Sequence, residues 1–165
     1  MASKKGISLT IGVLAAITMA SFVFWFLPQN SEITFVVSDF ESHLDGVKNV
    51  HGVISEAVDT EFQNLLDGNI SPKEYIEQAE ISTVQINSQI IQLVESKATE
   101  EWLESYISYI EALKHYNTYV RETIVAAAMI EEGTESAEIE EFITKISQFK
   151  ENSESYIFKS DNSRP

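Results

Sequence analysis

The helical character of this chain is clearest in residues 71–94, SPKEYIEQAEISTVQINSQIIQLV. Ser71 is suited to cap a helix, Pro72 fits the first helical position, and Glu74 completes a capping box. Behind this signal, mostly apolar residues recur every three or four positions, a spacing that places them on one buried face of a helix. The stripe consists of Ile76, Ala79, Thr83, Ile86, Ile90 and Val94, broadened by Val84 and Ile91. This pattern predicts a helix over residues 72–97.

Three further segments share this periodicity, and turn or capping residues bound them. Ser31 is a potential N-cap before the first segment, Asp67-Gly68 can end it, and the apolar phase shifts near Ala98 between the second and the third. The expected helices cover residues 32–66, 72–97, 100–131 and 135–157. They predict an all-α domain over residues 28–158, an antiparallel four-helix bundle with short connections. We expect a flexible tail over residues 159–165.

Before this domain, residues 7–27, ISLTIGVLAAITMASFVFWFL, contain no charged side chain. As an α-helix they would span about 31 Å, close to the hydrocarbon thickness of about 30 Å. We therefore expect one transmembrane helix that acts as a signal anchor for a single-pass cell membrane protein. Because Lys4 and Lys5 precede it and acidic residues follow it, the positive-inside rule places residues 1–6 in the cytoplasm and the helical domain outside.

Two other interpretations of this segment are open. Thr18-Met19-Ala20 has the small residues of a signal-peptide cleavage site, although cleavage there would leave the apolar residues 22–27 as an exposed terminus. Lys5-Gly6-Ile7-Ser8, a basic residue and a glycine before a long apolar helix, resembles the class III leader of archaeal pilin-like proteins over residues 1–27. That resemblance implies cleavage after Gly6 and packing of the apolar helices as the core of a filament. The all-helical remainder differs from the β-rich heads common in such pilins.

The domain is strongly acidic. Removing Lys4 and Lys5 from the formal net charge of −15 leaves −17 on residues 28–165. Such a surface repels nucleic acid and anionic lipid head groups, so we expect no nucleic-acid partner. The chain contains no cysteine, which excludes disulfides, thiolate metal sites and a cysteine nucleophile.

The histidines are the first candidates for chemistry. Asp39 lies four residues before His43, and Glu111 lies four residues before His115, so each pair can meet on one helical face. Neither pair is the Glu-x-x-His motif that carboxylate-bridged di-iron bundles repeat. Phosphate-binding loops, nucleophile elbows and zinc-protease motifs are also missing from the sequence. We therefore expect no catalytic set, no metal site and no cofactor, and interpret the two pairs as ordinary helix-surface contacts.

His51 and Asn117 interrupt apolar stripes and are candidates for a polar layer in the core. They lie at similar distances from the starts of the first and third helices, which run parallel in an up-down-up-down bundle. Thr83 or Asn87 could join them there. Leaving such groups buried and unpaired costs about 1–3 kcal/mol each, so we expect hydrogen bonds that fix the register of the helices. A small-ligand or proton-sensing site is the alternative.

The third expected helix presents aromatic residues beside its core stripe. They are Trp102, Tyr109, Tyr116 and Tyr119. Because aromatic residues are enriched in protein interfaces, these four form a candidate interaction face. The alternative is that they only cover the edge of the bundle.

Together these patterns favour a non-enzymatic protein, tethered to the membrane through residues 7–27, that works through contacts with another protein or with copies of itself. It would be an accessory subunit of a membrane complex or an envelope scaffold. A small-ligand-binding sensor or carrier is the first alternative, because helical bundles can hold ligands between helices. A pilin-like filament subunit is the second.

Overall fold

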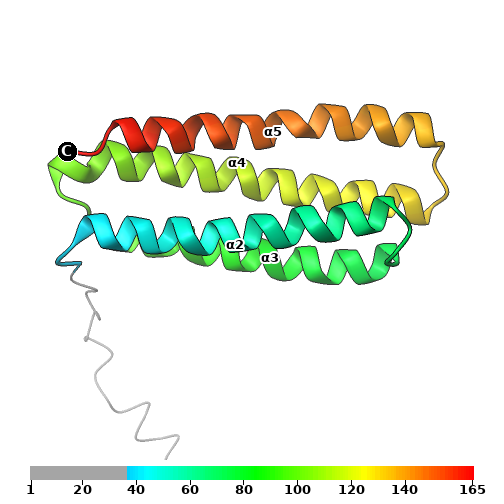
Figure 1. Cartoon of the computed structure of the whole chain (residues 1–165), viewed down its shortest axis with the longest axis horizontal. Coiled ribbons are helices and arrows are strands. Elements are labelled where there is room, and N and C mark those ends of the chain that lie inside the picture. Colours follow the sequence, from blue (N-terminus) through cyan, green and yellow to red (C-terminus); the bar gives the residue numbers. More distant parts are fainter. Residues whose placement is uncertain (1–36) are drawn as a thin grey trace, which may run out of the picture. The chain divides into compact units, whose positions relative to one another are not determined.

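The computed structural model describes residues 37–165, which contain four helices and no strand. The helices are α2 (Phe40–Leu66), α3 (Pro72–Glu95), α4 (Glu100–Glu131) and α5 (Ser136–Asn162). Consecutive helices run in opposite directions and are joined by short turns at the two ends of the bundle (Figure 1). The prediction of an all-α domain with a four-helix bundle is therefore confirmed.

The predicted transmembrane helix, residues 7–27, lies outside the described residues, as do residues 1–6 and the junction at Pro28. Within residues 37–165, none of the helices combines the length and the apolar character needed to cross a bilayer. The bundle is thus the part of the chain that the structure defines.

The first helix starts later than predicted. Val37, Ser38 and Asp39 are not helical, and α2 begins at Phe40. The carboxylate of Asp39 accepts hydrogen bonds from the backbone N–H of Ser42 at 2.9 Å and from its hydroxyl at 2.7 Å. Asp39 is therefore the N-cap, and the predicted continuous helix from residue 32 is wrong over these three positions. The continuing apolar stripe concealed this start.

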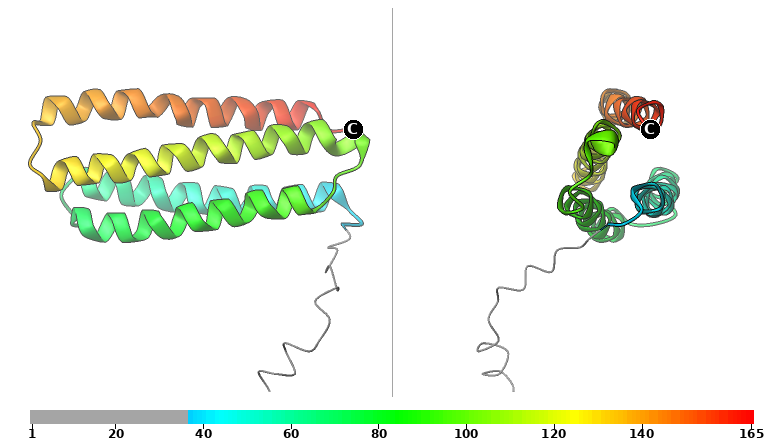
Figure 2. Two further views of the ribbon diagram at one scale, coloured as in Figure 1. Left: turned by 180° about the vertical axis from the view of Figure 1, so that it is seen from behind. Right: turned by 90° about the vertical axis from the view of Figure 1, so that its left-hand side faces the viewer.

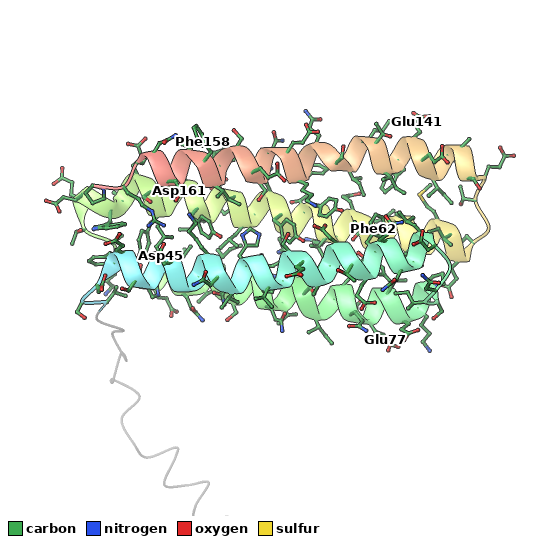
Figure 3. All side chains as sticks on the ribbon, in the orientation of Figure 1. Asp45, Phe62, Glu77, Glu141, Phe158 and Asp161 are labelled. Atoms are coloured by element: carbon green, nitrogen blue, oxygen red, sulfur yellow. The ribbon has the colours of Figure 1, made fainter. Side chains whose placement is uncertain are left out.

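Helix α4 is the central element of the bundle. It packs against α2, α3 and α5, whereas the backbones of α2 and α5 do not come close to each other within the described chain. The end-on view shows α5, α4 and α3 in a curved row, with α2 beside α3 (Figure 2). Side chains close the remaining side, because ion pairs join α2 to the C-terminal region: Asp45 to Arg164, Lys48 to Asp161 and Asp59 to Lys150. Figure 3 shows Asp45 and Asp161 near the same end of the bundle.

The contact between α4 and α5 is built on small residues. Ser105 and Ala112 on α4, and Ser153 and Ser160 on α5, are almost completely buried. The Ser105 hydroxyl donates to the Ser160 carbonyl at 2.8 Å, and the Ser153 hydroxyl donates to the Ala112 carbonyl at 2.8 Å. We call these four residues the small-residue seam. Small side chains let the two helices approach closely. Backbone carbonyls of the opposite helix satisfy the hydroxyls of Ser105 and Ser153, and the Ser160 hydroxyl lies 3.1 Å from that of Ser105.

The small-residue seam extends into the residues that were predicted as a flexible C-terminal tail. Helix α5 continues to Asn162, five residues beyond the predicted end at residue 157, because Ser160 is buried against Ser105. Beyond the helix, the Arg164 guanidinium lies 2.6 Å from the Asp45 carboxylate. Residues 159–162 are therefore the last turn of a packed helix rather than a flexible tail.

The α3–α4 connection contains one strained residue, which gives a testable prediction. Lys97 follows the C-cap Ser96 with φ of 51°, whereas glycines hold the left-handed positions after α2 and α4. A side chain with a Cβ pays about 1–2 kcal/mol in this conformation. We expect Lys97→Gly to raise the free energy of unfolding by about 0.5–1 kcal/mol, after the greater entropy of glycine in the unfolded chain is counted. Urea unfolding followed by circular dichroism would measure this.

Lys97→Ala is the matched control, because it removes the same charge and keeps the Cβ. An equal gain in Lys97→Ala would assign the effect to charge and contradict the backbone explanation.

Candidate functional site

His51 lies in the core at the contact between α2 and α4. Its side chain is only 4% exposed. The Nδ1 atom is 2.8 Å from the Tyr109 hydroxyl, and the imidazole ring packs edge-on against Tyr116, with 4.8 Å between ring centres. Within the described residues, Nε2 has no hydrogen-bond partner. We call His51, Tyr109 and Tyr116 the histidine–tyrosine layer.

Burial keeps every group in this layer neutral. It lowers the pKa of His51 to about 4 and raises the pKa values of Tyr109 and Tyr116 above their ordinary range. An imidazolium here would carry two N–H groups, and only Nδ1 has a partner to receive one. The layer therefore disfavours a positive charge, and His51 is a neutral hydrogen-bonding group near pH 7.

Two more tyrosine hydroxyls are hydrogen-bonded at neighbouring levels of the bundle. Tyr106 donates to the Phe40 carbonyl at 2.8 Å, so its oxygen is left to accept from His43 Nδ1 at 3.1 Å. Tyr75, on α3, donates to the Thr123 hydroxyl of α4 at 2.6 Å. Each ring contributes apolar area to the core while its hydroxyl finds a partner. The tyrosines thus tie α4 to both α2 and α3.

The four residues predicted as one polar layer divide instead among three separate contacts. His51 bonds to Tyr109, whereas the Asn117 amide donates to the Asn87 amide oxygen at 2.8 Å on the α3 side of α4. Thr83 donates to the Glu80 carbonyl of its own helix. His51 therefore bonds across the α2–α4 contact to Tyr109, a residue expected at the surface, while Asn117 and Asn87 join α4 to α3.

The predicted aromatic interaction face also needs correction. Tyr109, Tyr116 and Tyr119 are buried in the bundle, and Trp102 is half-buried against the core. The three tyrosines point toward α2 and α5, since their contacts are His51, the Ser55 carbonyl and Lys150, whereas Trp102 packs edge-on against Tyr106. The three tyrosines are therefore not available as a surface for another protein in this structure.

The two histidine–carboxylate pairs are also not assembled. The Asp39 carboxylate accepts a hydrogen bond from the Ser42 N–H, and His43 Nδ1 is hydrogen-bonded to the Tyr106 hydroxyl. The ring of His115 stacks on Tyr156, with 5.3 Å between ring centres, and Glu111 pairs with Lys114. Both pairs are thus engaged by other neighbours on the bundle.

An unpartnered apolar face lies on the outer side of α2 and α3. Val53 and Val84 are 69% and 67% exposed. Around them lie further exposed apolar side chains and a groove of about 440 Å³ between the two helices, with Gln85, Ser88 and Gln89 in its lining. We call this surface the α2–α3 face and define it by Val50, Val53, Ile81, Val84 and Ile91. The sequence contained a signal for it, because Val84 and Ile91 fell beside the core stripe and broadened it.

Comparison of the chain with protein-family models, with characterised proteins and with solved structures finds no significant match. The geometry of its own residues is therefore the basis for a functional interpretation.

Proposed function

We propose that this chain is a membrane-tethered helical bundle that works without catalysis, by holding another protein at its outer surface. The observation that carries the proposal is the α2–α3 face. Exposed valines and isoleucines gathered on two adjacent helices leave apolar area in water, and such patches mark binding sites more often than scattered single residues do. The uncharged segment 7–27 supports the tether.

The rest of the bundle supports a structural role for its interior. The hydroxyls of Tyr75, Tyr106 and Tyr109 are each engaged in hydrogen bonds between helices. Interhelical hydrogen bonds of this kind fix the register of the helices, so the outer surface of the bundle is rigid. A rigid helical surface lowers the entropy lost on binding.

The test is extraction of the full-length chain in a mild detergent after an alkaline wash of the membranes. We expect the full chain to stay with the membrane through the wash, a chain of residues 28–165 to be released, and a second protein to co-purify with the full chain in a fixed ratio. Release of the full chain would refute the tether. A lone full-length chain would refute the protein-binding role.

A second candidate function, the binding of a small apolar ligand, is favoured by a groove of about 500 Å³ at the end of the bundle where α4 joins α5. Its lining includes Leu65, Leu66, Ile130, Ile139 and Ile143. Native mass spectrometry of the purified chain distinguishes the two functions, because a ligand would add a small, defined mass in place of a protein partner.

A further inference from the structure

The shape of the α2–α3 face fits a helix. Ile81, Val84, Ser88 and Ile91 follow one another at intervals of three, four and three residues along α3, the spacing of a seam against which another helix packs. From Ile81 to Ile91 this seam is about 15 Å long, or nearly three helical turns. Ser88 is small and sits in the lining of the groove, so an apolar side chain of an incoming helix has a place to insert.

The polar groups of the groove are amides and a hydroxyl rather than charges. Gln85 and Gln89 line it from α3, and Asn49 lines it from α2. Such groups can satisfy a polar side chain or two of an occupant without burying an ion. The floor of the groove therefore suits the apolar stripe of an amphipathic helix.

The edges of the face carry one sign of charge. Between residues 49 and 95 the only lysine or arginine is Lys73, near the start of α3. Glu56, Glu77, Glu80 and Glu95 are all exposed on the two helices, and Figure 3 shows Glu77 pointing away from the bundle. A second copy of this chain on the same face would bring these carboxylates together, whereas lysines or arginines would complement them.

We propose that the α2–α3 face docks an amphipathic helix whose apolar stripe is flanked by lysine or arginine residues. The inference rests on the proposed function and names the partner chemistry and the surface that serve it. Apolar side chains of that helix enter the groove between Val53 and Ser88, and its basic flanks lie against the exposed glutamates.

The first experiment measures binding of synthetic helical peptides to the full-length chain in detergent micelles. One peptide has a leucine stripe with lysine flanks, the second has the same stripe with glutamate flanks, and the third is a scramble of the first. We expect only the first to bind, with an affinity that falls as salt is added. Equal binding of the scrambled peptide would reveal general charge attraction and overturn the proposal.

A matched pair of variants locates the site. Val84→Lys places in the face a positive charge, the same sign as the lysine flanks of the peptide. Ile107→Lys makes the same kind of change at a position on α4 where the side chain is 51% exposed. We expect Val84→Lys to weaken binding of the lysine-flanked peptide by about tenfold or more, and Ile107→Lys to change it by less than about twofold. Circular dichroism confirms that both variants fold. Equal effects of the two variants would overturn the proposed location.

A photoreactive residue at position 84 or 107 of the full chain, in its own membrane, then separates this inference from the proposed function. Capture from position 84 of a basic amphipathic helix, identified by its peptides, supports the inference. Capture from position 107 alone overturns the location and leaves the protein-binding role standing. Self-capture from position 84 makes a second copy the occupant and overturns the partner chemistry. No capture from either position, together with a lone chain after extraction, refutes both proposals.

Discussion

Lowering the pH from about 7.5 to about 5 is expected to destabilise the bundle by about 2 kcal/mol more than it destabilises a His51→Gln variant. The reason is the histidine–tyrosine layer. Burial lowers the pKa of His51 to about 4 in the folded chain, whereas an unfolded chain has a histidine pKa of about 6.5. Between these two pKa values, His51 is protonated in the unfolded chain and neutral in the folded chain.

The sign of the effect follows from this difference in proton binding. The free energy of unfolding is unaffected by His51 well above pH 6.5 and falls as the pH drops through the unfolded pKa toward 4. The full contribution approaches about 3 kcal/mol near pH 4. Protonation of the many surface carboxylates changes the stability of both proteins alike, so the difference between the two pH profiles reports His51. Urea unfolding of each full chain in a mild detergent, at several pH values, measures it.

Tyr109→Phe is the control for the hydrogen bond. It removes the hydroxyl that meets His51 Nδ1 and leaves the imidazole in place, so we expect a loss of about 1–2 kcal/mol near neutral pH with the steep pH dependence retained. Parallel pH profiles for the wild-type chain and His51→Gln would show that His51 is not held neutral by burial.

Capping residues and apolar spacing predicted most of the helices, because these signals depend only on residues within about one helical turn of each other. Ser71 accepts from the Glu74 N–H at 3.2 Å, and α3 begins at Pro72 as expected. The phase shift near Ala98 marked the connection between α3 and α4, where Lys97 adopts its left-handed conformation. The start of α2 was missed because Asp39 is a cap inside an apolar stripe that continues on both sides of it.

The candidate site was harder to predict, because hydrophobic periodicity does not tell which neighbour a side chain meets. Tyrosine suits both a wet surface and a core with a hydroxyl partner, and only the packing of α2 on α4 decides that Tyr109 faces His51. Val84 and Ile91 satisfy the core pattern by residue type, yet α3 is rotated so that they face outward. Rotation of a helix by a fraction of a turn is a tertiary property that no single helix specifies.

The small-residue seam between α4 and α5 was missed for a related reason. Apolar stripes were sought, and Ser105, Ser153 and Ser160 do not belong to one. A signal was nevertheless present, since Ser105 and Ala112 are seven residues apart on α4, as Ser153 and Ser160 are on α5. Seven residues bring a helix back to nearly the same face, so small residues at this interval predict a close helix contact.

This seam gives the second large prediction, a loss of about 3 kcal/mol in the free energy of unfolding for Ser153→Leu. Ser153 is 1% exposed and its hydroxyl meets the Ala112 carbonyl. A leucine has no room there and would force α4 and α5 apart, a kind of overpacking that costs about 1–3 kcal/mol or occasionally more, in addition to the lost hydrogen bond. Ser155→Leu is the matched control, because Ser155 is exposed on the same helix and surface changes stay within about 0.5 kcal/mol. Leucine favours helix more than serine does, and this gain is the same in both variants. Equal stability of the two variants would therefore mean that α4 and α5 do not pack through Ser153 and that the register of this helix pair is different.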